Sequence, residues 1–128
     1  MGTILKLECS KCDYDETLNI GQGIRDNDPE NFLGSFPDSV RSGIEHITGS
    51  GAIWTYEKML AICSRCHRYT TVPAFRSLED DGMEIYGMSE CRHESSDCTV
   101  TRYDGFKTVL KCPKCNSQMA VSEIGIWD

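Results

Sequence analysis

The chain has 128 residues, 39% of them hydrophobic, and a formal net charge of −7 at pH 7. This length suits one domain or two very small ones, and small domains with thin cores usually need a metal ion, disulfides or a partner. The acidic total disfavours non-specific binding to nucleic acids. No apolar run approaches the roughly 18 residues that span a membrane, so we expect no membrane association.

The cysteines indicate a reducing compartment. We expect no secretory signal, because Cys9 interrupts the segment where its apolar core would run, and this favours a cytoplasmic protein. Thiols stay reduced there, so paired cysteines are typical of metal sites or redox centres. The chain has three C-x-x-C pairs and two single cysteines, which are Cys9 and Cys12, Cys63 and Cys66, Cys112 and Cys115, then Cys91 and Cys98.

Short aliphatic and β-branched segments flank each pair and predict strands. In chain order they are residues 4–8, 17–20, 59–62, 69–72, 108–110 and 119–121. A strand–turn–strand unit therefore recurs three times, with one C-x-x-C pair in each turn. Such a turn usually ends in a residue with positive φ, and the residue after each pair is of a type that tolerates it. These residues are Asp13, His67 and Asn116.

A partly helical insertion is expected between the first and second pairs, at about residues 21–58. Its first part, 21–34, is rich in turn-forming residues and predicts irregular structure. A helix is expected to begin at Pro37, with Ser35 as a candidate N-cap, and to be ended by Gly49 and Gly51.

The apolar residues of this insertion predict how it packs. A stripe that contacts the strands is expected from residues at helical spacing, which are Val40, Ile44 and Ile47. Residues 54–60 fit either a second short helix or an extension of the following strand, and Trp54 is expected to pack beside the helix. Trp127 is expected in a closing strand, with its ring covering one of the strand–turn–strand units.

Four ligands from two such turns suit a structural zinc ion, which binds cysteine sulfur at about 2.3 Å in a tetrahedron. Eight cysteines therefore predict two zinc ions per chain. The candidate ligands are Cys9, Cys12, Cys63, Cys66, Cys91, Cys98, Cys112 and Cys115, with His93 as an alternative to Cys91. We expect no catalysis, since neither an H-E-x-x-H motif nor a zinc deaminase motif is present.

The spacing of the ligands predicts their pairing. Cys98 and Cys112 have 13 residues between them, a length that suits one hairpin between two half-sites. We therefore expect the first two C-x-x-C pairs to share the other site, and the long loop between them is permitted because its entropy cost grows only logarithmically with length. The second site would combine the third pair with Cys98 and with either Cys91 or His93. An alternative joins the second and third pairs and leaves Cys9, Cys12, Cys91 and Cys98 as the other set.

Residues 7–14, 62–69 and 111–116 resemble the rubredoxin-type knuckles of zinc-ribbon proteins. More loosely, the chain resembles a group of small uncharacterised bacterial zinc-ribbon proteins, which open with a short strand into a C-x-x-C-x-Tyr knuckle and end with a C-P-x-C knuckle and Trp-Asp. The segments that carry this likeness are 1–5, 9–14, 112–115 and 127–128. The resemblance implies two ribbon sites and no known catalysis. Such proteins tend to have a further knuckle near residues 95–98, where this chain has Cys98 alone.

We therefore predict a small, β-rich α+β fold with two zinc-ribbon sites. One ribbon, with the insertion, would occupy residues 1–78 and the other residues 79–128. The predicted function is a non-enzymatic zinc-binding module that mediates macromolecular interaction, and the net charge favours a protein partner over a nucleic acid. The alternatives are a rubredoxin-like iron electron carrier or thiol-redox protein, and a nucleic-acid-binding zinc ribbon.

A nucleic-acid-binding ribbon would use the basic residues near the knuckles, with Tyr14 or Tyr69 stacking on bases. Those basic residues are Lys11, Arg65, Arg68, Arg76, Lys107, Lys111 and Lys114. The other explanation of the same residues is that they balance the charge of the thiolates.

Overall fold

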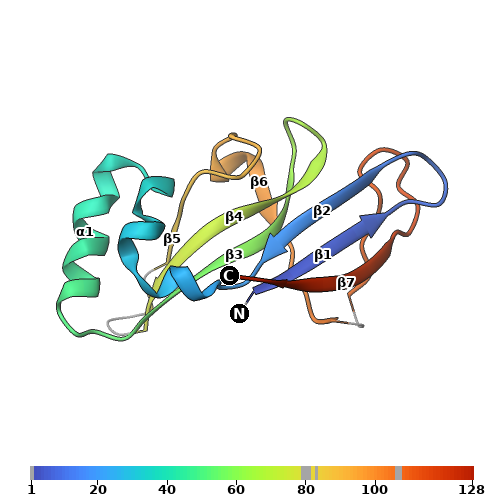
Figure 1. The fold of residues 1–128 in the computed structure, drawn as a ribbon. Helices are drawn as coiled ribbons and strands as arrows, with labels where there is room; N and C mark the ends of the chain where they lie inside the picture. The colour runs from blue at the N-terminus through green and yellow to red at the C-terminus, as the bar shows by residue number, and fades with distance from the viewer. Residues whose placement is uncertain (1, 79–81, 83, 106–107) are drawn as a thin grey trace.

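The chain folds into two antiparallel sheets and a helical insertion, in a computed structural model that describes residues 2–78, 82, 84–105 and 108–128 (Figure 1). The terminal sheet has the order β2-β1-β7, with β1 at Gly2–Glu8, β2 at Asp15–Ile20 and β7 at Ala120–Trp127. The central sheet has the order β5-β4-β3-β6, with β3 at Trp54–Cys63, β4 at Arg68–Ser77, β5 at Glu84–Tyr86 and β6 at Cys98–Val100. A small, β-rich α+β fold is thereby confirmed.

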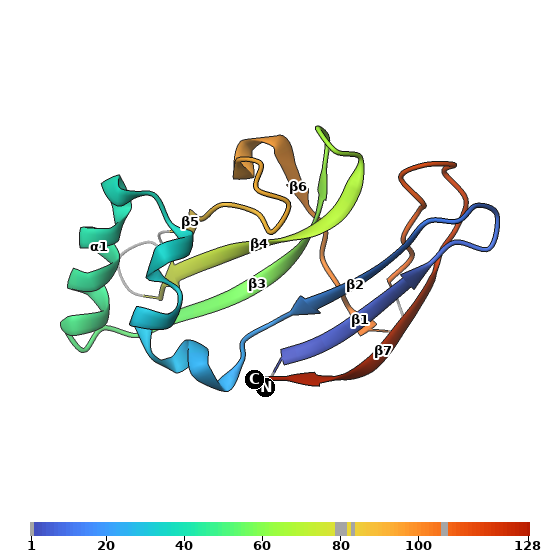
Figure 2. The same ribbon diagram turned by 45° about the horizontal axis from the view of Figure 1, so that its top comes forward.

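The terminal sheet joins the two ends of the chain, which lie side by side in Figures 1 and 2. Strand β1 pairs with β2 on one edge and with β7 on the other. Its Leu5 and Leu7 are fully buried, while the alternate side chains point away from the core. The expected division after residue 78 would place β1 and β7 in different ribbons, whereas these two strands pair along the length of β1.

The third strand–turn–strand unit forms only in part. Residues 108–110 are not a strand, and a single bridge between Lys111 and Gln118 marks the place of the expected ladder. The longer strand β7 instead supplies hydrogen-bond partners along the whole free edge of β1. Residues 108–110 could form only a few ladder hydrogen bonds. That number is too small to outweigh the long pairing of β7 with β1.

The insertion begins with three 3-10 turns, at Ile24–Asn27, Pro29–Asn31 and Leu33–Ser35, and continues as helix α1 at Asp38–Gly49. The expected helix and its end are confirmed. The N-cap prediction is wrong: Pro37 occupies that position without a side-chain hydrogen bond, and Ser35 closes the preceding turn. Residues 54–60 belong to strand β3 rather than to a second helix.

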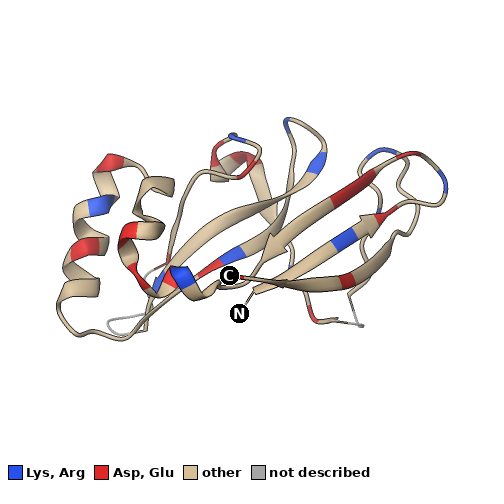
Figure 3. Ribbon diagram, viewed as in Figure 1, with Lys and Arg blue, Asp and Glu red and all other residues tan. Residues whose placement is uncertain are grey.

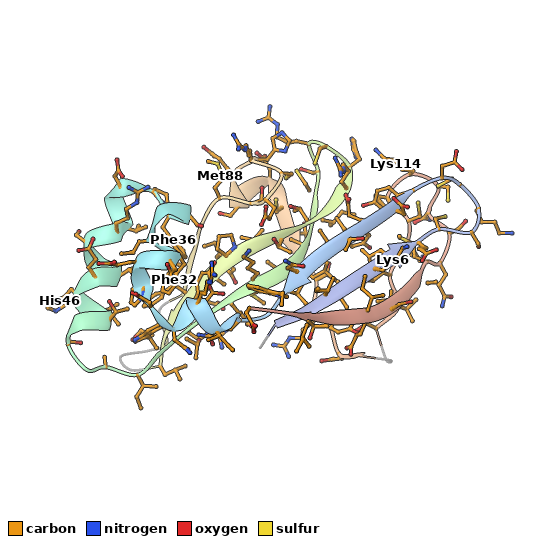
Figure 4. All side chains as sticks on the ribbon, in the orientation of Figure 1. Lys6, Phe32, Phe36, His46, Met88 and Lys114 are labelled. Carbon is orange, nitrogen blue, oxygen red and sulfur yellow. The ribbon has the colours of Figure 1, made fainter. Side chains whose placement is uncertain are left out.

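Two separate cores stabilise these elements. Under α1, five fully buried or nearly buried side chains form an aromatic cluster with one aliphatic member, and they are Phe32, Phe36, Ile44, Tyr56 and Phe75. Val40, Ile47 and Trp54 pack against this aromatic core, as the stripe predicted. Figure 4 shows Phe32 and Phe36 between α1 and the strands.

The second core lies between the two sheets. It contains Leu5, Leu7, Ile20, Leu60, Tyr69, Leu110, Cys112 and Met119. The ring of Trp127 seals one end of the terminal sheet, since its Nε1 donates a 2.9 Å hydrogen bond to the Ile20 carbonyl oxygen. No helix within the described residues combines the length and the apolar character needed to cross a membrane.

One glycine ties the insertion to the central sheet, and it provides a test of this contact. A Cβ atom at Gly87 would overlap the Ser35 carbonyl oxygen and lie 2.8 Å from Cγ of Pro73. The Gly87 and Met88 amides hydrogen-bond the Pro73 and Ser35 carbonyls, so neither neighbour can move freely. We expect Gly87→Ala to destabilise the protein by about 1–3 kcal/mol in urea unfolding.

The matched control for Gly87→Ala is Gly43→Ala on the exposed face of α1, where an added Cβ meets nothing within 4 Å. That substitution is expected to stabilise by about 0.5–1 kcal/mol, because it raises helix propensity. Equal free energies of unfolding for the two variants would contradict the close contact at Gly87.

Candidate metal centres

Four cysteines from the two ends of the chain converge on one point, and we name them the terminal cluster: Cys9, Cys12, Cys112 and Cys115. Their sulfurs all lie within 4.8 Å of one another. The Cys9 and Cys115 sulfurs are 3.4 Å apart, and those of Cys12 and Cys112 are 3.5 Å apart. A tetrahedral zinc site has sulfurs separated by about 3.8 Å, so only small shifts are needed to close this cluster on an ion.

Backbone hydrogen bonds shape the turns of the terminal cluster. The Cys112 amide donates to the Ser117 carbonyl at 2.7 Å, and the Asn116 amide donates to the Cys112 carbonyl at 2.8 Å. Asn116 has the predicted positive φ, of 64°. Asp13 does not have it, because the first turn is wider and closes through a hydrogen bond from the Cys9 amide to the Tyr14 carbonyl at 3.0 Å.

A second group of donors, the central cluster, consists of Cys63, Cys66, Cys91 and His93. Cys63 ends β3, and Cys66 lies in the turn to β4, where His67 has the predicted positive φ of 52°. The Cys63 sulfur lies 3.3 Å from Nδ1 of His93. All four donor atoms lie within 4.8 Å of one another, which suits a site of three sulfurs and one imidazole nitrogen.

The loop before β6 presents two of these donors together. The buried hydroxyl of Ser89 donates to the His93 carbonyl at 2.6 Å and accepts from the His93 amide at 3.1 Å. Arg92 has a φ of 66°, which turns the chain between Cys91 and His93. A count of the cysteines makes Cys91 and His93 alternatives, whereas the Cys-x-His spacing is the sequence signal for their presence in one cluster.

The expected pairing of the ligands is wrong. The first C-x-x-C pair meets the third, not the second, because β1 pairs with β7. The alternative of joining the second and third pairs is contradicted by the same contacts. Cys98 does not approach the third pair: it lies on β6, directly opposite Cys63 on β3, and outside the four central donors.

The thiols differ in their tendency to ionise. Hydrogen bonds from Ser117 lower the pKa of Cys115 to about 6. Burial opposes ionisation of Cys91, but hydrogen bonds from Ser89 and His93 outweigh it and lower the pKa of Cys91 to about 6. Burial and the neighbouring thiols raise the pKa of Cys66 to about 11. Crowded thiolates repel one another, so each cluster favours a bound cation.

Burial, together with the nearby Cys63 and Cys91, also raises the pKa of Cys98 to about 11, although the Ser89 hydroxyl opposes this. Cys98 therefore favours the neutral thiol at pH 7, in contrast to Cys91.

The basic residues near the knuckles are in part neutralised by carboxylates. Arg68 pairs with Glu16 across the two sheets, with a nitrogen–oxygen distance of 2.7 Å. Arg65 pairs with Asp97. Arg76 pairs with Glu84 and lies opposite Thr55, at the end of β4 that is remote from the knuckle. Among the described residues, Lys11, Lys111 and Lys114 form no such ion pair, and Lys107 lies outside those residues. Figure 3 shows basic residues at the tips of both knuckle regions, with acidic residues beside them.

The two tyrosines named as base-stacking candidates have structural contacts instead. The Tyr14 hydroxyl accepts a 2.8 Å hydrogen bond from the Tyr69 amide, and the Tyr69 hydroxyl donates to the Lys111 carbonyl at 2.9 Å. Tyr69 is buried in the core between the sheets. His46 projects from the exposed face of α1, away from both clusters, as Figure 4 shows.

The donor sets of both clusters fit a zinc ion: four sulfurs in the terminal cluster, and three sulfurs with one imidazole nitrogen in the central cluster. Comparisons of the chain with models of protein families, with curated proteins and with solved structures found no match. The geometry of the two clusters therefore carries the functional argument.

Proposed function

We propose that this chain is a non-enzymatic, structural zinc-binding module that holds two zinc ions and mediates macromolecular interaction, with a protein as its partner. The observation that carries this proposal is that each cluster brings four donor atoms within 4.8 Å of one another. Four protein ligands occupy all four coordination positions of a tetrahedral zinc ion and leave none for a substrate or an activated water. The role of the metal is then to fix the turns and the strands that flank them.

The surface supports a protein partner over a nucleic acid. Arg65 and Arg68, beside the central knuckle, and Arg76, at the other end of β4, are paired with carboxylates, which reduces their attraction for phosphates. Strand β7 has no ladder partner on its outer edge among the described residues. On this strand Ile124 and Ile126 are 54% and 64% exposed. An unpaired edge with apolar side chains favours strand addition by a partner protein.

The metal content is the first test of the proposed function. Elemental analysis of reduced, freshly purified protein is expected to give two zinc ions per chain and a colourless solution. A metal-free protein with the same circular dichroism spectrum would contradict a structural role for the clusters.

The partner class is tested with substitutions on β7. Ile126→Asp places a charge on the exposed edge and is expected to abolish capture of the proteins that the wild type retains. The matched control is Ile53→Asp, because Ile53 is 61% exposed but lies outside β7, and it is expected to retain them. Binding of random-sequence RNA or DNA at physiological salt, unchanged by Ile126→Asp, would favour the nucleic-acid alternative instead.

An iron electron carrier is the second candidate, and the terminal cluster is the observation that favours it. Four cysteine sulfurs from two facing C-x-x-C turns are also the donor set of a rubredoxin-type iron. Purified protein with one iron per chain and a red, thiolate-type visible spectrum that bleaches on reduction would support it.

A further inference from the structure

A groove lies where the start of α1, the end of β5 and the loop before β6 meet, and we name it the β5 groove. Residues 34–38, Arg41, residues 86–88 and residues 94–96 line it. Its volume of about 640 Å³ lies within the range of known ligand sites. In Figures 1 and 2, β5 runs between α1 and β4. None of the lining residues belongs to β7 or is a cysteine, so this surface is separate from the edge of β7 and from both clusters.

The walls of the β5 groove are fixed by hydrogen bonds. The Met88 amide donates to the Ser35 carbonyl at 2.9 Å, which ties the turn before α1 to the end of β5. Nε of Arg41 donates to the Phe36 carbonyl at 2.8 Å and holds the first turn of the helix against the same segment. The opposite wall is the 3-10 turn at Ser95–Asp97. Because the groove is formed in the free protein, a ligand need not order its walls.

Apolar side chains are open to solvent in this groove. Met88 is 50% exposed, Tyr86 is half-buried and Pro37 is exposed. Figure 4 shows Met88 on the same side of the molecule as Phe36, which closes the floor below it. A methionine side chain adapts its shape to different apolar partners. The groove therefore suits an apolar side chain of a ligand.

The edge of β5 also offers main-chain hydrogen bonds. The Gly87 amide donates to the Pro73 carbonyl at 2.8 Å, and Tyr86 lies opposite Ala74 at the next position of the ladder. Since hydrogen-bonded and non-hydrogen-bonded pairs alternate in an antiparallel ladder, the N–H and C=O of Tyr86 point away from β4. No strand within the described residues pairs with that outer edge.

The charges of the groove favour a basic ligand. Nη1 of Arg41 pairs with the Asp38 carboxylate at 2.6 Å, so these two charges offset each other. Glu94 on the opposite wall is exposed, makes no capping hydrogen bond and forms no ion pair with any described residue. Arg92 lines a neighbouring cavity rather than this one. The groove is left with one negative charge that a lysine or arginine of a ligand can neutralise.

We propose that the β5 groove binds an extended peptide segment of a partner protein in which apolar and basic residues alternate. The backbone of the segment pairs with Tyr86, as in strand addition to a sheet edge. Successive side chains of a strand point to opposite faces. An apolar side chain therefore packs on Met88 and Pro37, while its basic neighbour reaches Glu94.

The test is a fluorescence anisotropy titration of the full-length, zinc-loaded protein at physiological salt. The probe is a labelled hexapeptide of alternating leucine and lysine. It is expected to bind saturably and to shift the amide resonances of Tyr86 and Met88. A hexapeptide of alternating leucine and glutamate is expected to bind at least about tenfold more weakly, because its charges face Glu94. A peptide with the same lysines and leucines in two separate blocks is also expected to bind more weakly, because it cannot place both residue types in register.

Two pairs of variants test the two parts of the groove. Glu94→Lys is expected to reverse the preference between the leucine–lysine and leucine–glutamate peptides, whereas Glu45→Lys, at an exposed carboxylate of α1 outside the groove, should leave it unchanged. Tyr86→Pro removes the outward N–H without removing a hydrogen bond to β4, and proline is tolerated at such edge positions. It is expected to bind several-fold more weakly than Tyr86→Val, which also lacks the ring but keeps the amide.

Three results would overturn the inference. The first is the absence of saturable binding of the leucine–lysine peptide. The second is equal binding of the alternating and the block peptide, which would reduce the interaction to non-specific attraction by an acidic protein. The third is binding that survives both Glu94→Lys and Tyr86→Pro but is lost in Ile126→Asp, which would place the peptide on β7. Zinc is counted in every sample: its absence from the wild type would contradict the proposed function, whereas lost peptide binding with both ions present would contradict only the groove.

Discussion

Cys112→Ser is expected to empty the terminal cluster and to unfold the terminal sheet. Cys112 is both a ligand of that cluster and a buried member of the core between the sheets, with only 2% of its surface exposed. Structural zinc contributes on the order of 10–16 kcal/mol in small peptides at neutral pH, which compares with about 5–15 kcal/mol for the whole stability of a typical domain. Losing one ligand should therefore remove most of the stability of this half of the molecule.

The measurements for Cys112→Ser are zinc content and amide hydrogen exchange. We expect zinc to fall from two ions to one per chain, and the amides of β1 and β7 to lose their protection. The amides of α1 and β4 should stay protected, because they pack on the aromatic core, which contains no cysteine. Cys98→Ser is the matched control, since the same chemical change at a residue outside both clusters should leave two zinc ions and protected strands. A Cys112→Ser protein with two zinc ions would contradict the structural role of the site.

Local elements could be predicted because their signals lie within a few residues. Strand β1 follows from the alternation around Leu5 and Leu7, and α1 follows from the helical spacing of Val40, Ile44 and Ile47. The knuckles follow from the C-x-x-C spacing, and positive φ was anticipated at His67 and Asn116. In each case the residues that decide the conformation are neighbours in the sequence.

The pairing of the ligands could not be predicted in this way. Loop-closure entropy grows by only about 0.6 kcal/mol for each doubling of loop length, so spacing alone separates the alternative pairings poorly. What decides is which strand occupies the second edge of β1, and this is β7, at the other end of the chain. Nothing within a few residues of β1 specifies that long-range partner.

The aromatic core was also missed, for a different reason. Phe32 lies in segment 21–34, whose turn-forming residues indicate irregular structure, and Phe36 lies between that segment and the expected start of the helix. Irregular segments usually run over the surface. The 3-10 turns instead bring both rings under α1, against Tyr56 and Phe75. The missing signal was the presence of large aromatic residues in a polar segment, since such side chains are costly to leave in water.

Phe32→Ala is expected to destabilise the half of the protein that contains the aromatic core, and that core includes no cysteine. The Phe32 ring stacks on Tyr56 with centroids 4.1 Å apart and an interplanar angle of 4°, and it also contacts Phe36, Trp54 and Phe75. Its side chain is 1% exposed. Replacing a buried phenylalanine by alanine costs about 3–5 kcal/mol, through lost burial and the cavity that remains.

The readout of Phe32→Ala separates the aromatic core from the metal sites. Urea unfolding should show the lower stability, near-ultraviolet circular dichroism should lose the signal of packed aromatic rings, and zinc content should remain at two ions per chain. Phe32→Leu is the matched control and should cost less, because it leaves a smaller cavity. Loss of a zinc ion from Phe32→Ala would mean that the aromatic core and the metal clusters fold as one unit. The two variants together test whether the halves are stabilised separately. If Phe32→Ala retains both zinc ions and Cys112→Ser retains the aromatic signal, the protein has two separately stabilised halves that share strands β3 and β4.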